Sequence, residues 1–172
     1  DAWKRTLTEA DLRVIARGST ARYASGTADV RAVGGEIGAR YVMEGSLRHA
    51  AGQLRVAVQL VDATSGAHLW AETYNRPFDP NAVFALQDDL VPRIVSTCAD
   101  HFGVLARAIS EAVRSKPVAE LTPYEALMRG FGYHFRLTPE EHSAARVALE
   151  RAVERAPANA DCWAMLPWVY AH

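Results

Sequence analysis

Residues 41–74 read YVMEGSLRHAAGQLRVAVQLVDATSGAHLWAETY, and this stretch decides the fold class. Apolar residues at 54, 56, 58 and 60 alternate with less apolar ones, which is the pattern of a strand that buries one face. Turn-forming residues, with a glycine in each group, separate three such strands at 50–53 and 62–67. The stretch therefore predicts an antiparallel meander with strands at 41–49, 54–62 and 68–74.

Upstream of the meander, the sequence predicts one strand and one helix. Residues 12–16 are apolar enough to predict a short buried strand, and apolar residues at 30, 33 and 37 recur at helical spacing. Gly34 and Gly35 lie inside that helix, where each lowers the helix propensity. Close packing of the helix against a neighbour is the expected reason for both glycines.

Downstream of the meander, the pattern is helical to the end of the sequence. Apolar residues at 83, 86, 90, 94 and 98 form one stripe, and Pro92 is expected to kink or interrupt that helix near Leu90 and Val91. Three further helices are expected at 124–136, 139–155 and 161–172. The predicted fold class is α+β: a small mixed or antiparallel sheet with helices on one side, followed by an all-α segment of helical hairpins.

Composition excludes several function classes. The 172 residues carry 19 Lys and Arg against 20 Asp and Glu, a net charge of −1, which argues against a strongly basic nucleic-acid-binding module. No apolar run is long enough for a membrane span. Cys98 and Cys162 both fall at apolar helical positions, so buried free thiols in a reducing cytoplasm are expected rather than a disulfide.

The sequence contains no recognised motif for catalysis, cofactor binding or metal binding. The six histidines show no metal-ligand spacing with cysteine or carboxylate. The run from Gly34 to Gly38 is not a dinucleotide fingerprint, and the sequence contains neither a P-loop lysine motif nor a G-x-S-x-G elbow. No catalytic, cofactor-binding or metal-binding residue is therefore predicted.

One polar group remains a candidate ligand site. His68, Trp70 and Glu72 alternate along the third strand, so they are expected to share one face that could line a polar pocket. A structural interpretation competes with this one: Trp70 packs beneath the helices, while Asp62 and Thr64 fix the preceding turn by side-chain hydrogen bonds to the backbone.

Small and large residues alternate in residues 122–172 with the spacing of a helical repeat. The positions that carry the pattern are Gly130, Tyr133, Ala145, Leu149, Ala152, Pro157, Trp163, Leu166 and Tyr170. This pattern resembles tetratricopeptide repeats, in which small residues sit where paired helices touch and a proline ends the second helix. The resemblance implies one and a half repeats within residues 116–172. Pro167 stands where the repeat has a small residue, which predicts a bend.

Residues 1–115 resemble the TolB-like domain that precedes tetratricopeptide repeats in many bacterial regulatory proteins. The runs that carry the resemblance are Val14–Arg17, Asp29–Gly34, Gly38–Arg48, Val58–Glu72 and Phe84–Asp88. The family has a first strand and helix that this chain is expected to lack, and the open sheet edge makes a homodimer a candidate state.

The resemblance implies a non-catalytic regulatory and protein-interaction segment of a bacterial signalling protein, in the C-terminal part of an adenylate cyclase-like protein. Protein partners are expected through the tetratricopeptide region, and nucleic acid and membrane partners are not. The alternative is a small-ligand sensor that uses the face of His68, Trp70 and Glu72. A ligand-dependent shift in melting temperature would favour that alternative.

Overall fold

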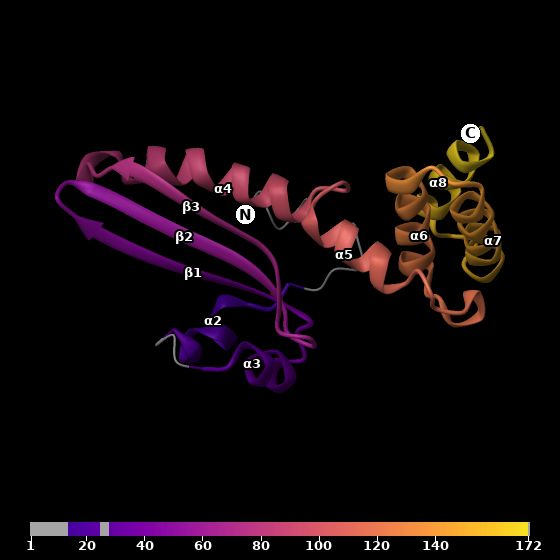
Figure 1. Cartoon of the computed structure of the whole chain (residues 1–172), viewed down its shortest axis with the longest axis horizontal. Helices are drawn as coiled ribbons and strands as arrows, with labels where there is room; N and C mark the ends of the chain where they lie inside the picture. The colour runs from indigo at the N-terminus through magenta and orange to yellow at the C-terminus, as the bar shows by residue number, and fades with distance from the viewer. Residues whose placement is uncertain (1–13, 25–27, 172) are drawn as a thin grey trace. The chain divides into compact units, whose positions relative to one another are not determined.

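The protein's computed structural model describes residues 14–24 and 28–171 (Figure 1). The chain forms two compact units that divide between Val95 and Ser96. The first unit contains the sheet, and the described part of the second is entirely helical outside its loops. The α+β fold class expected from the sequence is confirmed.

The sheet of the first unit is an antiparallel meander of β1 (Tyr41–Ala50), β2 (Gln53–Asp62) and β3 (Ala67–Pro77), in the order β1-β2-β3. The β1–β2 ladder is regular from Tyr41 opposite Asp62 to Ala50 opposite Gln53. Ala51 and Gly52 close this hairpin with φ of 49° and 69°, the left-handed backbone that a tight two-residue turn requires. The three predicted strands are confirmed, each within a few residues at its ends.

The predicted strand at 12–16 is wrong for the residues that the structure describes. Residues 14–16 form no strand, and Val14 is 49% exposed. Ala16 instead precedes α2 (Arg17–Thr20), and its carbonyl accepts a hydrogen bond from the Ser19 N–H at 2.9 Å. In that helical turn the backbone groups bond to one another and not to a neighbouring strand. The 3-10 helix η1 (Ala21–Tyr23) follows α2 directly. Residues 12 and 13 lie outside the described part.

The helix expected around Val30 is α3 (Val30–Ile37), and only one of its two glycines serves close packing. A Cβ atom on Gly34 would collide with the Ala63 side chain, so glycine lets α3 approach the chain just after β2. A Cβ atom on Gly35 would meet nothing within 4 Å. The packing explanation is therefore confirmed for Gly34 and wrong for Gly35.

One face of the sheet carries the apolar core of the first unit. Leu54, Val58 and Leu60 of β2 are all under 10% exposed. After η2 (Pro80–Ala82), α4 (Val83–Ala99) runs beside the sheet (Figure 1), and Arg76 on β3 pairs with Asp89 on α4 at 2.9 Å. Pro92 does not interrupt α4, because losing one N–H removes a single helical hydrogen bond, the one to the Asp88 carbonyl.

After α4, the helices of the second unit are α5 (Val104–Ala112), η3 (Val118–Glu120), α6 (Pro123–Arg136), α7 (Pro139–Arg155) and α8 (Ala160–Ala171). The bounds of the last three match the predicted ones closely, whereas α5 and η3 were not predicted as separate helices. Thr138 accepts a hydrogen bond from the Glu141 N–H at 3.3 Å, and Pro139 occupies the first turn. α8 continues through Pro167.

The core of the second unit lies where α6, α7 and α8 meet. Ala145 and Leu149 of α7, together with Cys162 of α8, are completely buried. Cys98 is also buried, so both cysteines are buried, as predicted. Residues 115–117, where the two predicted segments join, lie inside this unit, and Lys116 Nζ donates to both carboxylate oxygens of Glu125 at 2.8 and 2.9 Å.

Candidate functional site

The structure does not bring the three residues of the candidate ligand face together. A β-bulge shifts the β2–β3 register, so that Trp70 lies opposite Leu60 while His68 lies opposite Val61. Paired residues of an antiparallel ladder share a face, and neighbours along a strand point to opposite faces. His68 is therefore separated from Trp70 and Glu72, and simple alternation could not reveal an extra residue in the strand.

Glu72 and Trp70 remain on one face, but their surroundings are those of a packed sheet. The Tyr74 hydroxyl donates to the Glu72 carboxylate at 2.9 Å, and Trp70 is half-buried beside the buried Leu60. His68 and Glu72 are exposed. The geometry favours the structural interpretation of Trp70 over a ligand pocket.

Asp62 is the least exposed acidic residue in the described part of the first unit, at 9%. Its Oδ1 accepts hydrogen bonds from the N–H groups of Thr64 and Ser65 at 2.8 and 3.2 Å, and its Oδ2 pairs with Arg40 at 3.3 Å. Burial acts to raise the pKa of Asp62, but these donors outweigh it and hold the pKa below the ordinary value. Asp62 therefore fixes the β2–β3 turn, as predicted, whereas Thr64 contributes through its backbone N–H.

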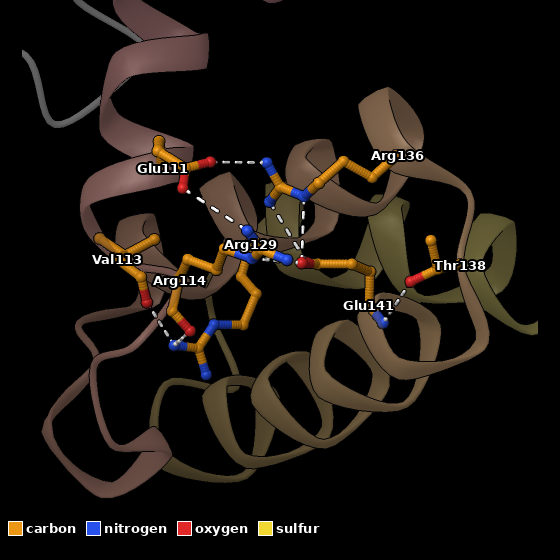
Figure 2. Close-up of polar contacts among 7 residues, drawn as sticks. All are labelled: Glu111, Val113, Arg114, Arg129, Arg136, Thr138 and Glu141. Atoms are coloured by element: carbon orange, nitrogen blue, oxygen red, sulfur yellow. Dashed lines mark hydrogen bonds and ion pairs between the residues drawn. The ribbon is translucent and has the colours of Figure 1, made fainter.

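The second unit contains a cluster of charged side chains, two of them buried, that was not predicted from the sequence (Figure 2). Its members, here called the arginine–glutamate cluster, are Glu111, Arg114, Arg129, Arg136 and Glu141. They come from α5, α6, α7 and the residues that follow α5. Arg129 falls on the apolar face of α6 beside Ala126 and Tyr133, and an arginine at such a position indicates a buried charge. The sequence does not indicate which residues pair with it.

Arg129 is only 4% exposed, and its guanidinium closes the end of α5. Its Nη2 donates to the carbonyls of Val113, Arg114 and Lys116, the last two at 3.1 and 2.6 Å. Terminal helix carbonyls lack partners within the helix and favour a nearby cation. Arg129 thus supplies hydrogen-bond donors and a positive charge to the carbonyl groups at the end of α5. Burial lowers the pKa of Arg129, although the charges of Glu141 and Glu125 act to raise it.

Glu141 is the anionic centre of the cluster and is 6% exposed. Arg114 Nε lies 2.7 Å and Arg136 Nε 3.0 Å from its Oε1, and Arg136 also pairs with Glu111 at 3.0 Å (Figure 2). Burial acts to raise the pKa of Glu141, but the two arginines outweigh it and lower the pKa. A carboxylate held ionised in this way is a poor general acid or base near neutral pH.

Ser110 is the remaining polar side chain buried beside this cluster. It is completely buried, and among the described residues its Oγ has no hydrogen-bond partner. A Cβ atom on Gly132 would collide with this Oγ, so Ser110 is packed tightly against α6. Without a base to take its proton, Ser110 has no activated hydroxyl for nucleophilic catalysis. The arginine–glutamate cluster therefore joins α5, α6 and α7.

The residues of the predicted repeat pattern occupy two kinds of position. The buried ones are Gly130, Tyr133, Ala145, Leu149, Ala152 and Leu166. Pro157, Trp163 and Tyr170 are exposed, the last two at 50% and 57%. A Cβ atom on Gly130 would lie 2.8 Å from Met165 Cγ, so glycine permits close contact between α6 and α8.

Another candidate site is a pocket in the second unit. A pocket of about 160 Å³ lies among η3, α6 and α7, lined by apolar side chains with Arg151 and Arg155. It is below the roughly 300 Å³ typical of small-molecule sites, and Arg155 is held by the Ala119 carbonyl at 3.1 Å. Within residues 14–24 and 28–171, no group of His, Cys, Asp and Glu could hold a metal ion. No helix in the same ranges is long and apolar enough to cross a bilayer.

Comparison with known proteins gives one informative relative. The chain is 36% identical over 155 residues to "Putative adenylate cyclase 3" of Rhizobium meliloti (strain 1021). The alignment covers 90% of this chain but 26% of that protein, so the chain spans about a quarter of its relative. No family model matches the chain.

Proposed function

We propose that this chain is a non-catalytic regulatory and protein-interaction segment of a bacterial adenylate cyclase-like signalling protein. The observation that carries the proposal is the alignment of 155 residues to a protein named as a cyclase, most of which lies outside the alignment. The part of the relative outside the alignment is long enough to contain a catalytic domain. The segment comprises a TolB-like domain and the start of a tetratricopeptide array, and it acts in the cytoplasm, where its two buried thiols stay reduced.

The ion pairs and hydrogen bonds of the buried carboxylates support a non-catalytic role. The two most buried acidic residues of the described part, Asp62 and Glu141, both pair with arginines, and Asp62 also accepts hydrogen bonds from backbone N–H groups. Their pKa values are lowered, whereas a general acid near neutral pH needs a raised one. These residues hold turns and helices in place.

The surface of α8 supports a role in protein interaction. Trp163 and Tyr170 are half exposed or more, although both are large aromatic residues. Trp163 is anchored by a hydrogen bond from its Nε1 to the Pro157 carbonyl at 2.9 Å, and Tyr170 by one to Glu150 at 2.6 Å. Aromatic side chains held in place lose little entropy on binding, which suits a protein contact surface.

The test compares three proteins in one assay of cyclic AMP formation from ATP with a divalent cation. They are the purified chain, the intact Rhizobium meliloti relative, and that relative with the aligned segment deleted. We expect turnover by the intact relative, none by the chain, and retained turnover with altered regulation after the deletion. Turnover by the chain alone would overturn the proposal, as would complete loss of turnover in a deletion variant whose remaining part is folded.

A further inference from the structure

β1 presents a long, regular edge. It forms ten residue pairs with β2 and, among the described residues, pairs with no other strand. An edge strand exposes a row of unpaired N–H and C=O groups that can template another strand. Residues 45–50 of β1 are all exposed.

This edge lacks three features that commonly prevent strand addition, namely proline, lysine and a bulge, whereas the opposite edge has a bulge and a proline. β1 contains neither proline nor lysine, and its ladder has no register shift. β3 contains a bulge opposite Leu60 and Val61 and ends at Pro77. Bulges and prolines are the common means by which sheets avoid pairing at an edge, so β1 is the edge open to a partner.

The charges on β1 are complementary to those of a second, antiparallel β1. When Ser46 lies opposite Ser46 of the second copy, Glu44 falls opposite Arg48 of that copy, and Arg48 falls opposite its Glu44. Both residues lie on the same face of the strand. Within one chain Arg48 lies opposite Arg55, a like charge, so the second copy would supply the carboxylate that β2 does not.

The other face of β1 is apolar in the same register. Met43 and Leu47 are 49% and 67% exposed and lie on the face that carries the β2 core residues. With Ser46 at the two-fold axis, Leu47 lies opposite Gly45 of the second copy and diagonal to its Met43 and Leu47. Four exposed apolar side chains would therefore gather at the axis and lose their contact with water.

We propose that the partner of the β1 edge is a second copy of this chain, paired antiparallel about Ser46 so that residues 42–50 of the two copies form one ladder. The two meanders then make a continuous six-stranded sheet. This dimer stands independently of the proposed function, because it rests on the edge, its charges and its apolar face.

Charge reversal tests the register directly. The chain is examined by sedimentation and light scattering over a range of concentrations, and we expect a dimer of twice 18.8 kDa. Glu44→Arg and Arg48→Glu each place two like-charged pairs in the dimer, and each should weaken it at least about tenfold. An equimolar mixture of the two variants restores both opposite-charge pairs, so a heterodimer should form.

The control is Glu154→Arg, which reverses an exposed charge on α7 in the second unit. It should leave the dimer intact. Thermal unfolding monitored by circular dichroism shows that each variant is folded, and recovery in the mixture requires that both are. A chain that remains monomeric at its highest soluble concentration would overturn the proposal. So would a dimer that neither reversal weakens, or a mixture that recovers nothing.

Discussion

At the scale of single residues, the carboxylate of Asp62 should stabilise the β2–β3 turn. In the variant Asp62→Ala, the N–H groups of Thr64 and Ser65 and the Arg40 guanidinium all lose their acceptor. We expect a loss of about 2 kcal/mol in the free energy of unfolding, measured by urea denaturation. Thr64→Ala is the matched control, because Thr64 takes part through its backbone, and it should change stability by less than about 0.5 kcal/mol. Equal losses in the two variants would contradict this account.

The carboxylate of Glu141 should make the stability of the second unit depend on pH in the acidic range. Its pKa is lowered in the folded chain, so its stabilising contribution is complete above the ordinary value of 4.5 and disappears as pH falls through the folded value. Glu141→Gln removes the charge between Arg114 and Arg136 and should cost about 2 kcal/mol at pH 7. The difference between wild type and variant should shrink steadily below pH 4.5.

The exposed neighbour Glu140 provides the control for that measurement. It lies in the same first turn of α7. Glu140→Gln should change stability by less than about 0.5 kcal/mol at pH 7. A stability difference between wild type and Glu141→Gln that stays constant from pH 7 to pH 3 would show that lost packing, and not the charge, causes the effect.

At the scale of the element, the two adjacent glycines of α3 should respond in opposite ways to the same substitution. Gly35→Ala adds a Cβ atom in open space within a helix, and should stabilise the chain by about 0.5–1 kcal/mol. Gly34→Ala forces that atom into Ala63 and should destabilise it by about 2 kcal/mol. Thermal unfolding of the two variants, each the control for the other, measures both effects. Stabilisation by both would mean that α3 does not need close contact with the chain after β2.

The contrast between these glycines also shows which elements the sequence could predict. The meander and the helices α6, α7 and α8 were predicted because periodic burial and turn residues act locally. The strand expected at 12–16 was wrong over 14–16, because a short apolar run fits a strand or a helical turn equally well. Gly34 and Gly35 are alike in sequence, and only the approach of Ala63 distinguishes them.

The candidate sites were less predictable than the elements, for two physical reasons. The face shared by His68 and Trp70 followed from strict alternation, and one extra residue at the bulge changes the face of everything beyond it. The arginine–glutamate cluster joins Arg129 to carbonyls 13 to 16 residues away and Arg114 to a carboxylate 27 residues away. Contacts over such separations leave no local pattern.

At the scale of the whole molecule, the division into two compact units predicts that the two carboxylates stabilise different parts of the chain. Asp62 belongs to the first unit and Glu141 to the second, and they share no hydrogen-bond partner. Hydrogen exchange followed by mass spectrometry of peptides should show faster exchange in the sheet for Asp62→Ala and in α5, α6 and α7 for Glu141→Gln. The effects of the double variant should add to within about 0.5 kcal/mol. Faster exchange throughout the chain in either single variant would instead show that the units unfold together.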